Sequence, residues 1–422
     1  MTNAAAIFAA LILSTAVLAQ SPLKYNFGLS NAPHDHINVL ATNIFSIDKG
    51  FGFEPGANIR CVAVKGKIQG VCTSDKPFYF SVALPEDNYK VTVTLGGAEP
   101  TNETVKVELR RLMLENVATR RGEIVTRSFI VNIRRPQIPT GAEVKLKDRE
   151  KTSEWWAWDD KLTLEFNGTN PTIHSIEIEP VKVPTIFLLG DSTVCDQPSE
   201  PYASWGQMLT RFFGPDAAIA NHAESGESLR SSLGAKRLDK VLSVMKPGDY
   251  LLIQYGHNDE KEKGEGVGAF TTFKSSLKYF VEEARKKGGN VILITPVQRR
   301  TFDASGKITN SHGDYPEAVR QAAKEEKVPI IDLNAMSKDL YESMGPERSG
   351  ILFKEGDGTH HNNYGAYELA KCVVQAMRDQ KLSIGKYLIK DLPTFDPKHP
   401  DSREAVAIPP SPSLTTQKPL GN

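Results

Sequence analysis

A serine, a histidine and an aspartate stand where they could act as nucleophile, base and orienting acid. An apolar stretch at residues 185–189 leads into the Gly-Asp-Ser motif of residues 190–192, where a sharp turn can present a serine hydroxyl. Far downstream, Asp357 comes three residues before His360. A serine is a weak nucleophile until a base takes its proton, and that base must be held by a third group. Ser192, His360 and Asp357 therefore predict acyl transfer through a serine.

Two further segments supply hydrogen-bond donors for an oxyanion. The tetrahedral intermediate of acyl transfer carries negative charge on the former carbonyl oxygen, and a donor aimed at that oxygen contributes roughly 3 to 4 kcal/mol. The candidates are the backbone amides of Ser192 and Gly226 and the side-chain amide of Asn258. Asp191 and Asp259 are expected to shape their turns by accepting local backbone hydrogen bonds. Each motif is common by chance alone, but each follows a predicted strand or begins a predicted helix, so the set favours an enzyme.

From residue 183 the chain alternates between buried strands and amphipathic helices. Strands are predicted at residues 185–189, 250–255, 291–295 and 329–333. Apolar residues at helical spacing predict helices around 270–284 and 369–377, the second capped at Asn362 or Asn363. This alternation is typical of a parallel sheet covered on both faces. Reactive loops then gather at the carboxyl ends of the strands, where Ser192 and residues 256–259 fall.

Residues 21–182 show the period of half-buried strands instead. Apolar and polar residues alternate at 89–95, 105–109, 129–133 and 162–166, with turn residues between the stretches. Several such strands without helices predict a β-sandwich. Residues 391–422 are rich in proline and predict an extended or disordered tail. The chain has 422 residues, and single cores stop growing near ~250 to 300 residues, so two domains are expected, at 21–182 and 183–390.

The amino terminus predicts export. Residues 4–19 form an apolar stretch ending in small residues, as in a signal peptide spanning residues 1–19, although no Lys or Arg precedes it. Cleavage after Ala19 would leave a soluble secreted or periplasmic protein, because no other apolar run reaches the ~18 residues of a membrane span. An uncleaved anchor is the alternative.

The charge balance bears on partners. Lys and Arg number 51 and Asp and Glu number 51, so the formal net charge is zero. Such a chain has no long-range attraction for nucleic acid or for an anionic membrane. The charge balance does not oppose binding of a neutral partner such as a glycan. The sequence does not indicate the oligomeric state.

Four cysteines suit an exported protein with up to two disulfides. Three pairings are possible, and the sequence leaves them open. Cys61 with Cys72 and Cys195 with Cys372 would respect the predicted domains. The second pair would brace the loop after Ser192; alternatively, Cys372 is simply buried on an apolar helical stripe.

The motifs resemble those of the SGNH, or GDSL-type, hydrolase superfamily. The matching blocks are residues 190–192, Gly226, residues 256–259 and residues 357–360. Within the superfamily, residues 190–194, 221–231, 256–259 and 357–362 are most similar to rhamnogalacturonan acetylesterases, and the resemblance covers residues 183–390.

This resemblance implies a three-layer α/β/α, flavodoxin-like domain that works without metal or cofactor. It implies that Ser192, Asp357 and His360 form the catalytic triad and that Ser192, Gly226 and Asn258 form the oxyanion hole. The implied activity is removal of acetyl groups from the rhamnogalacturonan backbone of pectin. A neutral His360 is required, so activity is expected to fall in acid as that histidine titrates.

The preceding sandwich resembles a galactose-binding-like, carbohydrate-binding domain. Trp155, Trp156 and Trp158 could stack on a sugar ring, but at least two of them are expected to pack in the core or at the domain interface. His34 and His36 could suggest a metal site, but one short cluster is more often a solvated loop. No metal is expected.

Four residues are candidate substrate contacts. His257 could touch substrate or be a structural histidine. Arg299, Arg300 and His312 belong to a segment long enough to form a rim loop, and the two arginines could pair with uronate carboxylates or lie on a solvated surface. His361 adjoins the base but is expected to point elsewhere.

Two alternatives remain open. An esterase of the same superfamily acting on xylan, another acylated glycan or a lipid ester would keep the same catalytic residues. A non-enzymatic glycan-binding protein would not need them, so the intact set argues against that class.

Overall fold

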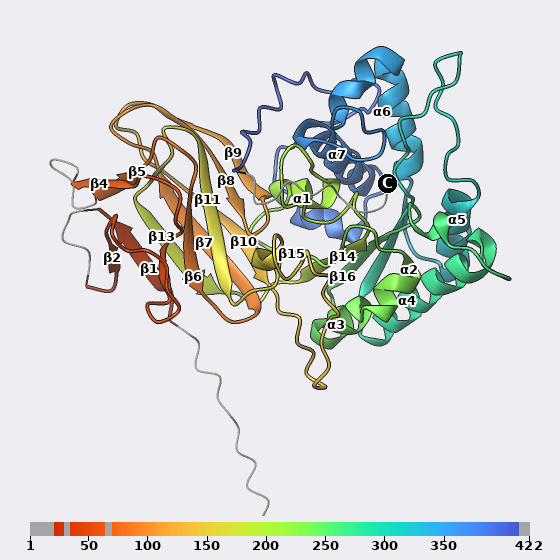
Figure 1. Cartoon of the computed structure of the whole chain (residues 1–422), viewed down its shortest axis with the longest axis horizontal. Helices are drawn as coiled ribbons and strands as arrows, with labels where there is room; N and C mark the ends of the chain where they lie inside the picture. The colour runs from red at the N-terminus through yellow and green to blue at the C-terminus, as the bar shows by residue number, and fades with distance from the viewer. Residues whose placement is uncertain (1–20, 29–33, 64–69, 413–422) are drawn as a thin grey trace, which may run out of the picture.

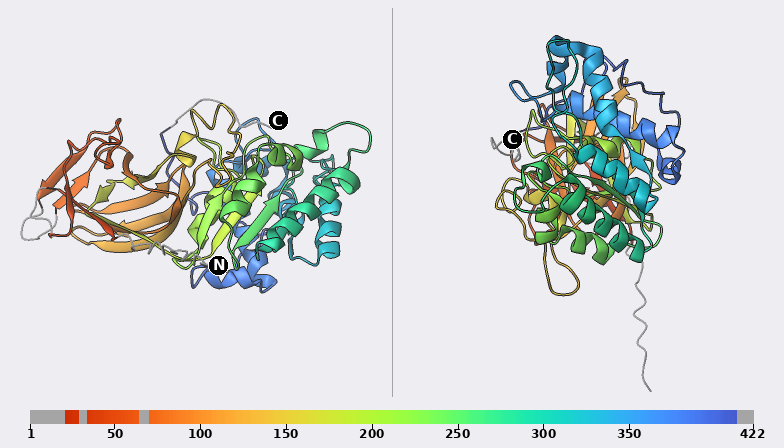
Figure 2. Two further views of the ribbon diagram at one scale, coloured as in Figure 1. Left: turned by 90° about the horizontal axis from the view of Figure 1, so that it is seen from below. Right: turned by 90° about the vertical axis from the view of Figure 1, so that its right-hand side faces the viewer.

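The computed structural model describes residues 21–28, 34–63 and 70–412. The predicted signal peptide lies outside the described residues. Antiparallel sheets from the first part of the chain lie beside a parallel sheet covered by helices (Figures 1 and 2). Among the described helices, none has both the length and the apolar character that a membrane crossing requires.

Three sheets form before residue 181. The first has the order β10 (Val125–Ile133), β7 (Asp87–Leu95), β13 (Ser175–Pro180), β1 (Leu23–Phe27), β2 (Ile37–Val39). The second has the order β3 (Phe51–Phe53), β6 (Phe78–Ala83), β11 (Lys161–Thr169), β8 (Thr101–Val107), β9 (Arg111–Thr119). The third has the order β12 (Thr172–Ile173), β5 (Gly70–Thr73), β4 (Arg60–Ala63). Neighbouring strands in these three sheets are antiparallel, except for β1 and β2, which are parallel.

The alternation of apolar residues explains how the first two sheets pack. In β7, Tyr89, Val91, Val93 and Leu95 are all buried, and residues of both sheets share one hydrophobic core. Aromatic rings fill much of this core; the Phe27 and Phe80 centroids lie 4.9 Å apart in an edge-to-face contact. The predicted all-β region is confirmed.

The second part of the chain forms a five-stranded sheet in which every pair is parallel. Its order is β15 (Ala218–Asn221), β14 (Thr185–Gly190), β16 (Tyr250–Gln254), β17 (Asn290–Ile294), β18 (Ile330–Ile331). The predicted parallel sheet is thus confirmed, although β15 was not predicted as a strand. The strand has only four residues, Ala-Ile-Ala-Asn, which are too few to reveal an alternation of apolar and polar side chains.

Helices cover both faces of this sheet. They are α1 (Trp205–Leu209), α2 (Leu229–Gly234), α3 (Arg237–Val244), α4 (Lys274–Lys286), α5 (Tyr315–Glu326), α6 (Leu333–Arg348) and α7 (Asn363–Asp379). Short 3₁₀ turns lie at Trp155–Ala157, Thr210–Phe212, Asp259–Lys261, Ser349–Leu352 and Ser383–Tyr387, and a π turn at Ala269–Phe273. Ile186 and Leu188 of β14 face α1, α6 and α7, whereas Phe187 and Leu189 face α3, α4 and α5. Alternate residues of one buried strand therefore serve two cores.

Both predicted helices form, with one difference. The Asn362 side chain accepts a hydrogen bond from the amide of Gly365 and caps α7, as predicted. Phe270, expected on the buried stripe of α4, is 43% exposed. The π turn before α4 changes the residue spacing at this point and turns Phe270 off the stripe.

The cysteine pairing is settled by the fold. Cys61 and Cys72 are paired across β4 and β5 in a disulfide. The suggested Cys195–Cys372 bridge is wrong, because both thiols are free and buried. Cys372 packs in the helical core, and the Cys195 sulfur lies 3.4 Å from the Ser225 hydroxyl.

The described part of the tail, residues 391–412, contains turns but no helix or strand. It runs back from α7 to the second antiparallel sheet, where the Lys106 ammonium donates to the carbonyl of Pro409 (2.6 Å) and to the hydroxyl of Ser411 (2.7 Å). The Ser411 hydroxyl donates to Glu165 at 2.8 Å. The tail, which the composition left as extended or disordered, thus joins the two parts of the chain.

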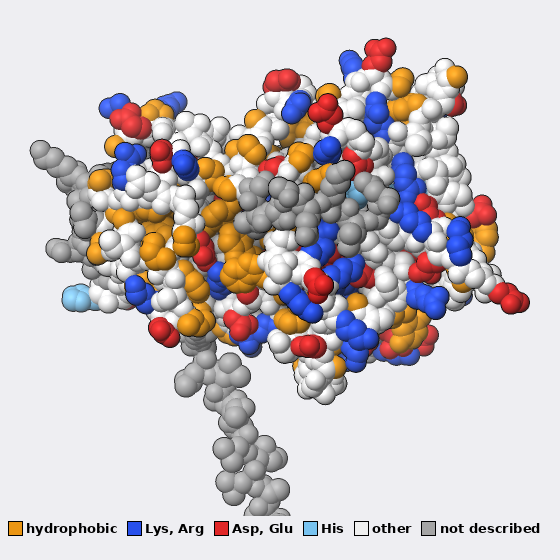
Figure 3. Space-filling model, viewed as in Figure 1, with side chains coloured by type: hydrophobic (Ala, Val, Ile, Leu, Met, Phe, Trp, Pro, Cys, Tyr) orange, Lys and Arg blue, Asp and Glu red, His pale blue; other side chains and the backbone are white. Residues whose placement is uncertain are grey.

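The surface carries charges of both signs. On the face drawn in Figure 3, Lys and Arg side chains lie among Asp and Glu, and hydrophobic side chains gather over the antiparallel sheets. That face shows no extended field of one sign, in keeping with the zero net charge.

Gly190 ends β14 where space for a side chain is lacking. A Cβ atom there would lie 2.5 Å from Cγ2 of Val194 and 2.7 Å from the carbonyl oxygen of Gln254. Gly190→Ala is therefore expected to lower the free energy of unfolding by about 1–3 kcal/mol, measured by urea denaturation. Gly234→Ala in α2, where nothing lies within 4 Å, is the control and should leave stability unchanged or slightly higher. Equal stability of the two variants would contradict the steric argument.

Candidate active site

Ser192 lies two residues after the end of β14, the strand between β15 and β16. Asp191 accepts hydrogen bonds from the amide (2.9 Å) and hydroxyl (2.8 Å) of Thr193, which fixes the turn as expected from the sequence. Behind it, the Gln197 side-chain amide donates to the Ser192 carbonyl at 2.7 Å. The serine is thus held on a rigid turn at the carboxyl end of a parallel strand.

The structure brings Ser192, His360 and Asp357 into one chain of contacts. The Ser192 hydroxyl lies 2.9 Å from Nε2 of His360, and Nδ1 of the same ring lies 3.0 Å from Oδ2 of Asp357. The other oxygen of Asp357 accepts from the amides of Thr359 (2.7 Å) and His360 (3.0 Å). A short loop before α7 therefore fixes acid and base relative to each other.

The Asp357 carboxylate is held in its charged form. Burial alone would raise its pKa, but hydrogen bonds from the His360 ring and from the His360 and Thr359 amides bring the pKa well below its usual range. An ionised Asp357 accepts a hydrogen bond from the Nδ1–H of His360. That tautomer leaves Nε2 free to accept the proton of Ser192.

The predicted oxyanion donors lie on segments that contact one another. Gly226 adopts a φ of 76°, in the left-handed region that favours glycine. The Asn258 amide donates to the carbonyl of Glu227 at 3.0 Å, and the Glu224 amide donates to the carbonyl of Gly190 at 3.1 Å. These bonds join the nucleophile turn, the Gly226 turn and the Asn258 loop.

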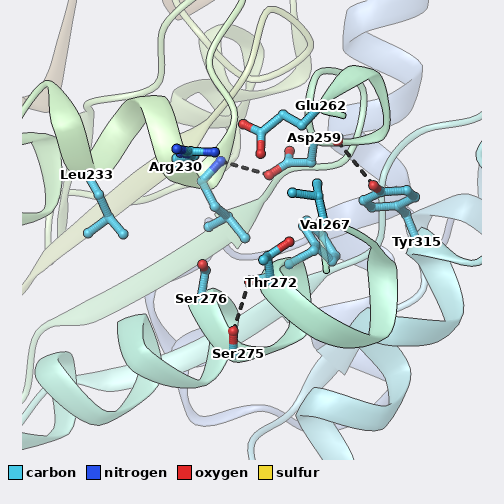
Figure 4. Close-up of a pocket in the computed structure, with 11 residues that line it drawn as sticks. Arg230, Leu233, Asp259, Glu262, Val267, Thr272, Ser275, Ser276 and Tyr315 are labelled. Carbon is cyan, nitrogen blue, oxygen red and sulfur yellow. Dashed lines mark hydrogen bonds between the residues drawn. The ribbon is translucent and has the colours of Figure 1, made fainter. Parts of the chain in front are cut away.

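Asp259 has a longer-range role than the local one expected. Its carboxylate accepts from the amide of Leu229 at 2.8 Å, so it ties the Asn258 loop to the start of α2. Burial raises the pKa of Asp259 to about 8. Beside it lies a cavity of about 210 Å³ between α2 and the first turn of α4, where the Tyr315 hydroxyl donates to the Asp259 carbonyl (Figure 4).

His257 and His312 are buried and face each other edge to face, with ring centroids 4.6 Å apart. Nδ1 of His257 lies 3.3 Å from Asp191, and burial lowers the pKa of His257 to about 4, so the ring is neutral. His312 places its ring nitrogens 2.8 Å from Glu260 and 2.8 Å from the carbonyl of Val297. Both histidines support the loops around the site, and their contact with substrate stays a prediction.

The two arginines of the rim loop are engaged within the chain. Arg299 pairs with Glu260 at 2.5 Å. The Arg300 side chain donates to the Ser349 hydroxyl at 3.0 Å, and its backbone amide donates to the carbonyl of Gly358 at 2.7 Å. Arg300 thereby anchors the loop that carries Asp357 and His360. Pairing of either arginine with a uronate stays a prediction.

His361 points away from the site, as expected. Its Nε2 lies 2.7 Å from the hydroxyl of Tyr341, in a buried contact beneath Phe353. Burial lowers the pKa of His361 to about 3.

Residues of the first part of the chain reach the site, and sequence reasoning missed them. At the turn between β8 and β9, Arg110 donates to the carbonyls of Gln197 (3.1 Å) and Tyr202 (2.8 Å), while Arg111 pairs with Asp196 at 2.7 Å. These arginines hold the loop that follows Ser192. Glu108 and Arg110 adopt positive φ angles of 53° and 62°, but neither residue type favours that conformation, so the sequence does not mark this turn.

The tryptophan cluster divides as expected. Trp156 and Trp158 are buried, and the guanidinium of Arg134 lies 4.4 Å from the Trp158 ring. Trp155 is 43% exposed, with the Lys161 ammonium 4.4 Å from its ring. Carbohydrate binding by this region stays a prediction. Of the three tryptophans, only Trp155 is exposed enough to stack on a sugar.

Among the described residues, no three His, Cys, Asp or Glu side chains are grouped so as to hold a metal ion. Asp35, between the two histidines considered above, pairs with Lys24 at 2.7 Å and contacts His36 at 2.9 Å.

The geometry of the active site is that of serine acyl transfer, with nucleophile, base and acid in line.

Comparison with known proteins agrees with this geometry. Residues 188–366 match the GDSL-like Lipase/Acylhydrolase family. The chain is 40% identical over 219 residues to the rhamnogalacturonan acetylesterase RhgT of Bacillus subtilis (strain 168), covering 48% of this chain and 94% of that protein. It is 30% identical over 375 residues to the uncharacterized esterase YxiM of the same organism, covering 85% of this chain and 91% of that protein.

The crystal structure of the B. subtilis YxiM protein superposes with a TM-score of 0.47 at 28% identity, covering 86% of this chain and 99% of that one. The family match falls on the parallel-sheet region, whereas the similarity to YxiM extends over both parts of the chain. The chain therefore belongs to the GDSL-like lipase/acylhydrolase family and is a carboxylic ester hydrolase.

Proposed function

We propose that this chain removes acetyl groups from a plant cell-wall polysaccharide, namely the rhamnogalacturonan backbone of pectin, through an acetyl-enzyme on Ser192. The observation that carries the chemistry is the contact chain from Ser192 through His360 to Asp357, at 2.9 and 3.0 Å. The substrate class is supported by similarity to RhgT at 40% and to a probable rhamnogalacturonan acetylesterase, YesY, at 35% identity. We further propose that the enzyme acts after export, as the apolar segment 4–19 suggests.

Acylation uses three groups in fixed positions. The Ser192 hydroxyl attacks the acetyl carbonyl while Nε2 of His360 takes its proton. The negative charge that develops on the carbonyl oxygen is met by the amides of Ser192 and Gly226 and by the Asn258 side chain. Asp357 stabilises the imidazolium, which then protonates the departing sugar hydroxyl.

Deacylation repeats the steps with water as the nucleophile. His360, neutral again after giving up its proton, takes a proton from water as the oxygen attacks the acetyl carbonyl. The tetrahedral intermediate uses the same oxyanion donors, and its collapse releases acetate and returns the proton to Ser192. No residue has to change its place between the two halves of the reaction.

The test is acetate release from three substrates in parallel: acetylated rhamnogalacturonan, acetylated xylan and 4-nitrophenyl acetate. We expect kcat/KM to be highest on the pectin substrate and to vanish on all three in Ser192→Ala. The matched control is Ser275→Ala, an exposed serine on α4 that should keep full activity.

Other outcomes separate the alternatives. Preference for xylan, or activity on the nitrophenyl ester alone, would keep the serine mechanism and overturn the pectin assignment. Polysaccharide binding without acetate release from any substrate would overturn the esterase mechanism itself.

A further inference from the structure

A segment of the first part of the chain, between β10 and the Trp155 turn, crosses to the Gly226 turn. The Lys145 amide donates to the carbonyl of Ala235, just before α3. Glu150 makes a two-bond ion pair with Arg237 of α3, at 3.0 and 2.7 Å. Between these two anchors, the Lys147 ammonium donates to the carbonyl of Ser225 at 2.5 Å.

The carbonyl that Lys147 binds belongs to the same peptide group as the Gly226 N–H. A peptide group is planar and trans, so its C=O and N–H point in opposite directions. A cation fixed on the Ser225 oxygen therefore sets the direction of the Gly226 N–H on the other side. It also polarises the peptide, because a strong hydrogen bond at the carbonyl strengthens the N–H as a donor.

Further contacts make Lys147 part of a wider support for this turn. Its ammonium lies 3.1 Å from the carboxylate of Glu227, which is 2% exposed. The carbonyl of Glu227 accepts the Asn258 side-chain amide at 3.0 Å. Lys147 thus binds on both sides of Gly226, a residue with φ of 76° and no side chain of its own to fix it. Asn258, another of the three proposed oxyanion donors, is anchored to the same short stretch.

We propose that Lys147 is a positioning residue of the esterase site, whose ammonium orients and polarises the Ser225–Gly226 peptide so that the Gly226 N–H meets the oxyanion. This inference rests on the proposed function, in which Gly226 and Asn258 are oxyanion donors. Through Lys147, the first part of the chain then contributes to the oxyanion hole.

Lys240 provides a matched control. Its side chain is fully buried and joins the same two parts of the chain, donating to Glu86 (2.8 Å) and to the carbonyl of Gln137 (2.8 Å). The contacts of its ammonium group lie away from residues 224–228. A lysine that only holds the two parts together should behave like Lys240, whereas one that shapes the oxyanion hole should not.

The experiment compares Lys147→Met, Lys147→Arg, Lys240→Met and Asn258→Ala in the full chain, with 4-nitrophenyl acetate as substrate. Loss of a direct oxyanion donor costs about 10²- to 10³-fold in kcat, which is expected for Asn258→Ala. For Lys147→Met, which weakens such a donor without removing it, kcat is expected to fall about tenfold with KM unchanged. Lys147→Arg should restore most of the lost kcat, and Lys240→Met should lower the melting temperature while keeping kcat.

A transition-state mimic gives a second readout. Phenylboronic acid forms a tetrahedral adduct with a nucleophilic serine and so directs an oxygen toward the hole. Its inhibition constant should rise in Lys147→Met by about the same factor as kcat falls, because both report stabilisation of the tetrahedral state. If Lys147→Met does not fold, Lys147→Gln, which keeps a donor without the charge, is judged by the same criteria.

The results distinguish failure of the Lys147 inference from failure of the proposed function. Full kcat in Lys147→Met beside a large loss in Asn258→Ala overturns the inference and leaves the proposed function standing. Equal losses in Lys147→Met and Lys240→Met also overturn it, because attachment of the two parts would then explain both. Full activity in Asn258→Ala and in Ser192→Ala would overturn the proposed function itself.

Discussion

Ser192→Ala is expected to lower kcat for ester hydrolysis by about 10⁶-fold, because no other group can form the acyl-enzyme. The residual rate over water should come from the oxyanion donors and substrate binding alone. The measurement is acetate release under single-turnover conditions, with enzyme in excess over substrate.

The variant should fold normally. Removing one hydroxyl leaves the turn of residues 191–193 and the bond from Gln197 to the Ser192 carbonyl in place. Circular dichroism and the melting temperature should therefore match wild type. Retention of more than a few per cent of the activity by a folded variant would show that Ser192 is not the nucleophile.

Asp357→Asn is expected to lower kcat by about 10⁴-fold with little change in KM. An amide in place of the carboxylate can donate to Nδ1 of His360, which favours the tautomer with the proton on Nε2 and blocks acceptance of the Ser192 proton. The matched control is Asp303→Asn, because Asp303 also accepts local amides, from Ser305 (2.8 Å) and Lys307 (3.0 Å), but lies on an exposed loop. The control should keep full activity, and a comparable loss in both variants would contradict the role of Asp357.

The same variant tests the charge state of Asp357. Its pKa is depressed in the folded protein, so the carboxylate stabilises the fold fully above the ordinary carboxyl pKa of about 3.9. This contribution is lost as the pH falls from that value toward the lower folded pKa. The difference in unfolding free energy between wild type and Asp357→Asn should be constant from pH 5 to 7 and shrink at pH 3, measured by urea denaturation. A difference that grows at pH 3 would have the wrong sign.

Short-range patterns carried most of what could be predicted. A run such as residues 185–189, apolar at every position after Thr185, indicates a strand buried on both faces, and the structure divides its apolar side chains between two cores. The strict alternation at residues 89–95 indicates a strand with one buried face. The Asp-x-x-His spacing suits a loop on which Asp357 holds both the amide and the ring of His360.

The interactions that sequence reasoning missed are long-range. Lys147 and Ser225 are 78 residues apart, and Arg110 and Gln197 are 87 apart. No local pattern distinguishes such a lysine or arginine from those on a solvated surface, because its partner is set by how the sheets pack. The suggested role of Arg299 and Arg300 shows the same limit, since neither Glu260 nor Ser349 could be recognised as a partner beforehand.

The return of the tail to the second antiparallel sheet changes where this protein can be divided. A cut after residue 390, the boundary that composition suggests, would remove the carbonyl of Pro409 and the hydroxyl of Ser411 from the Lys106 ammonium. Lys106 is 1% exposed, and burial lowers its pKa, so a truncated protein would leave that amine without its two acceptors in the tail. Strand β1 lies in the first antiparallel sheet, and the described tail contacts the second, with which the first shares a hydrophobic core. A protein made for expression should therefore keep the tail at least through Ser411.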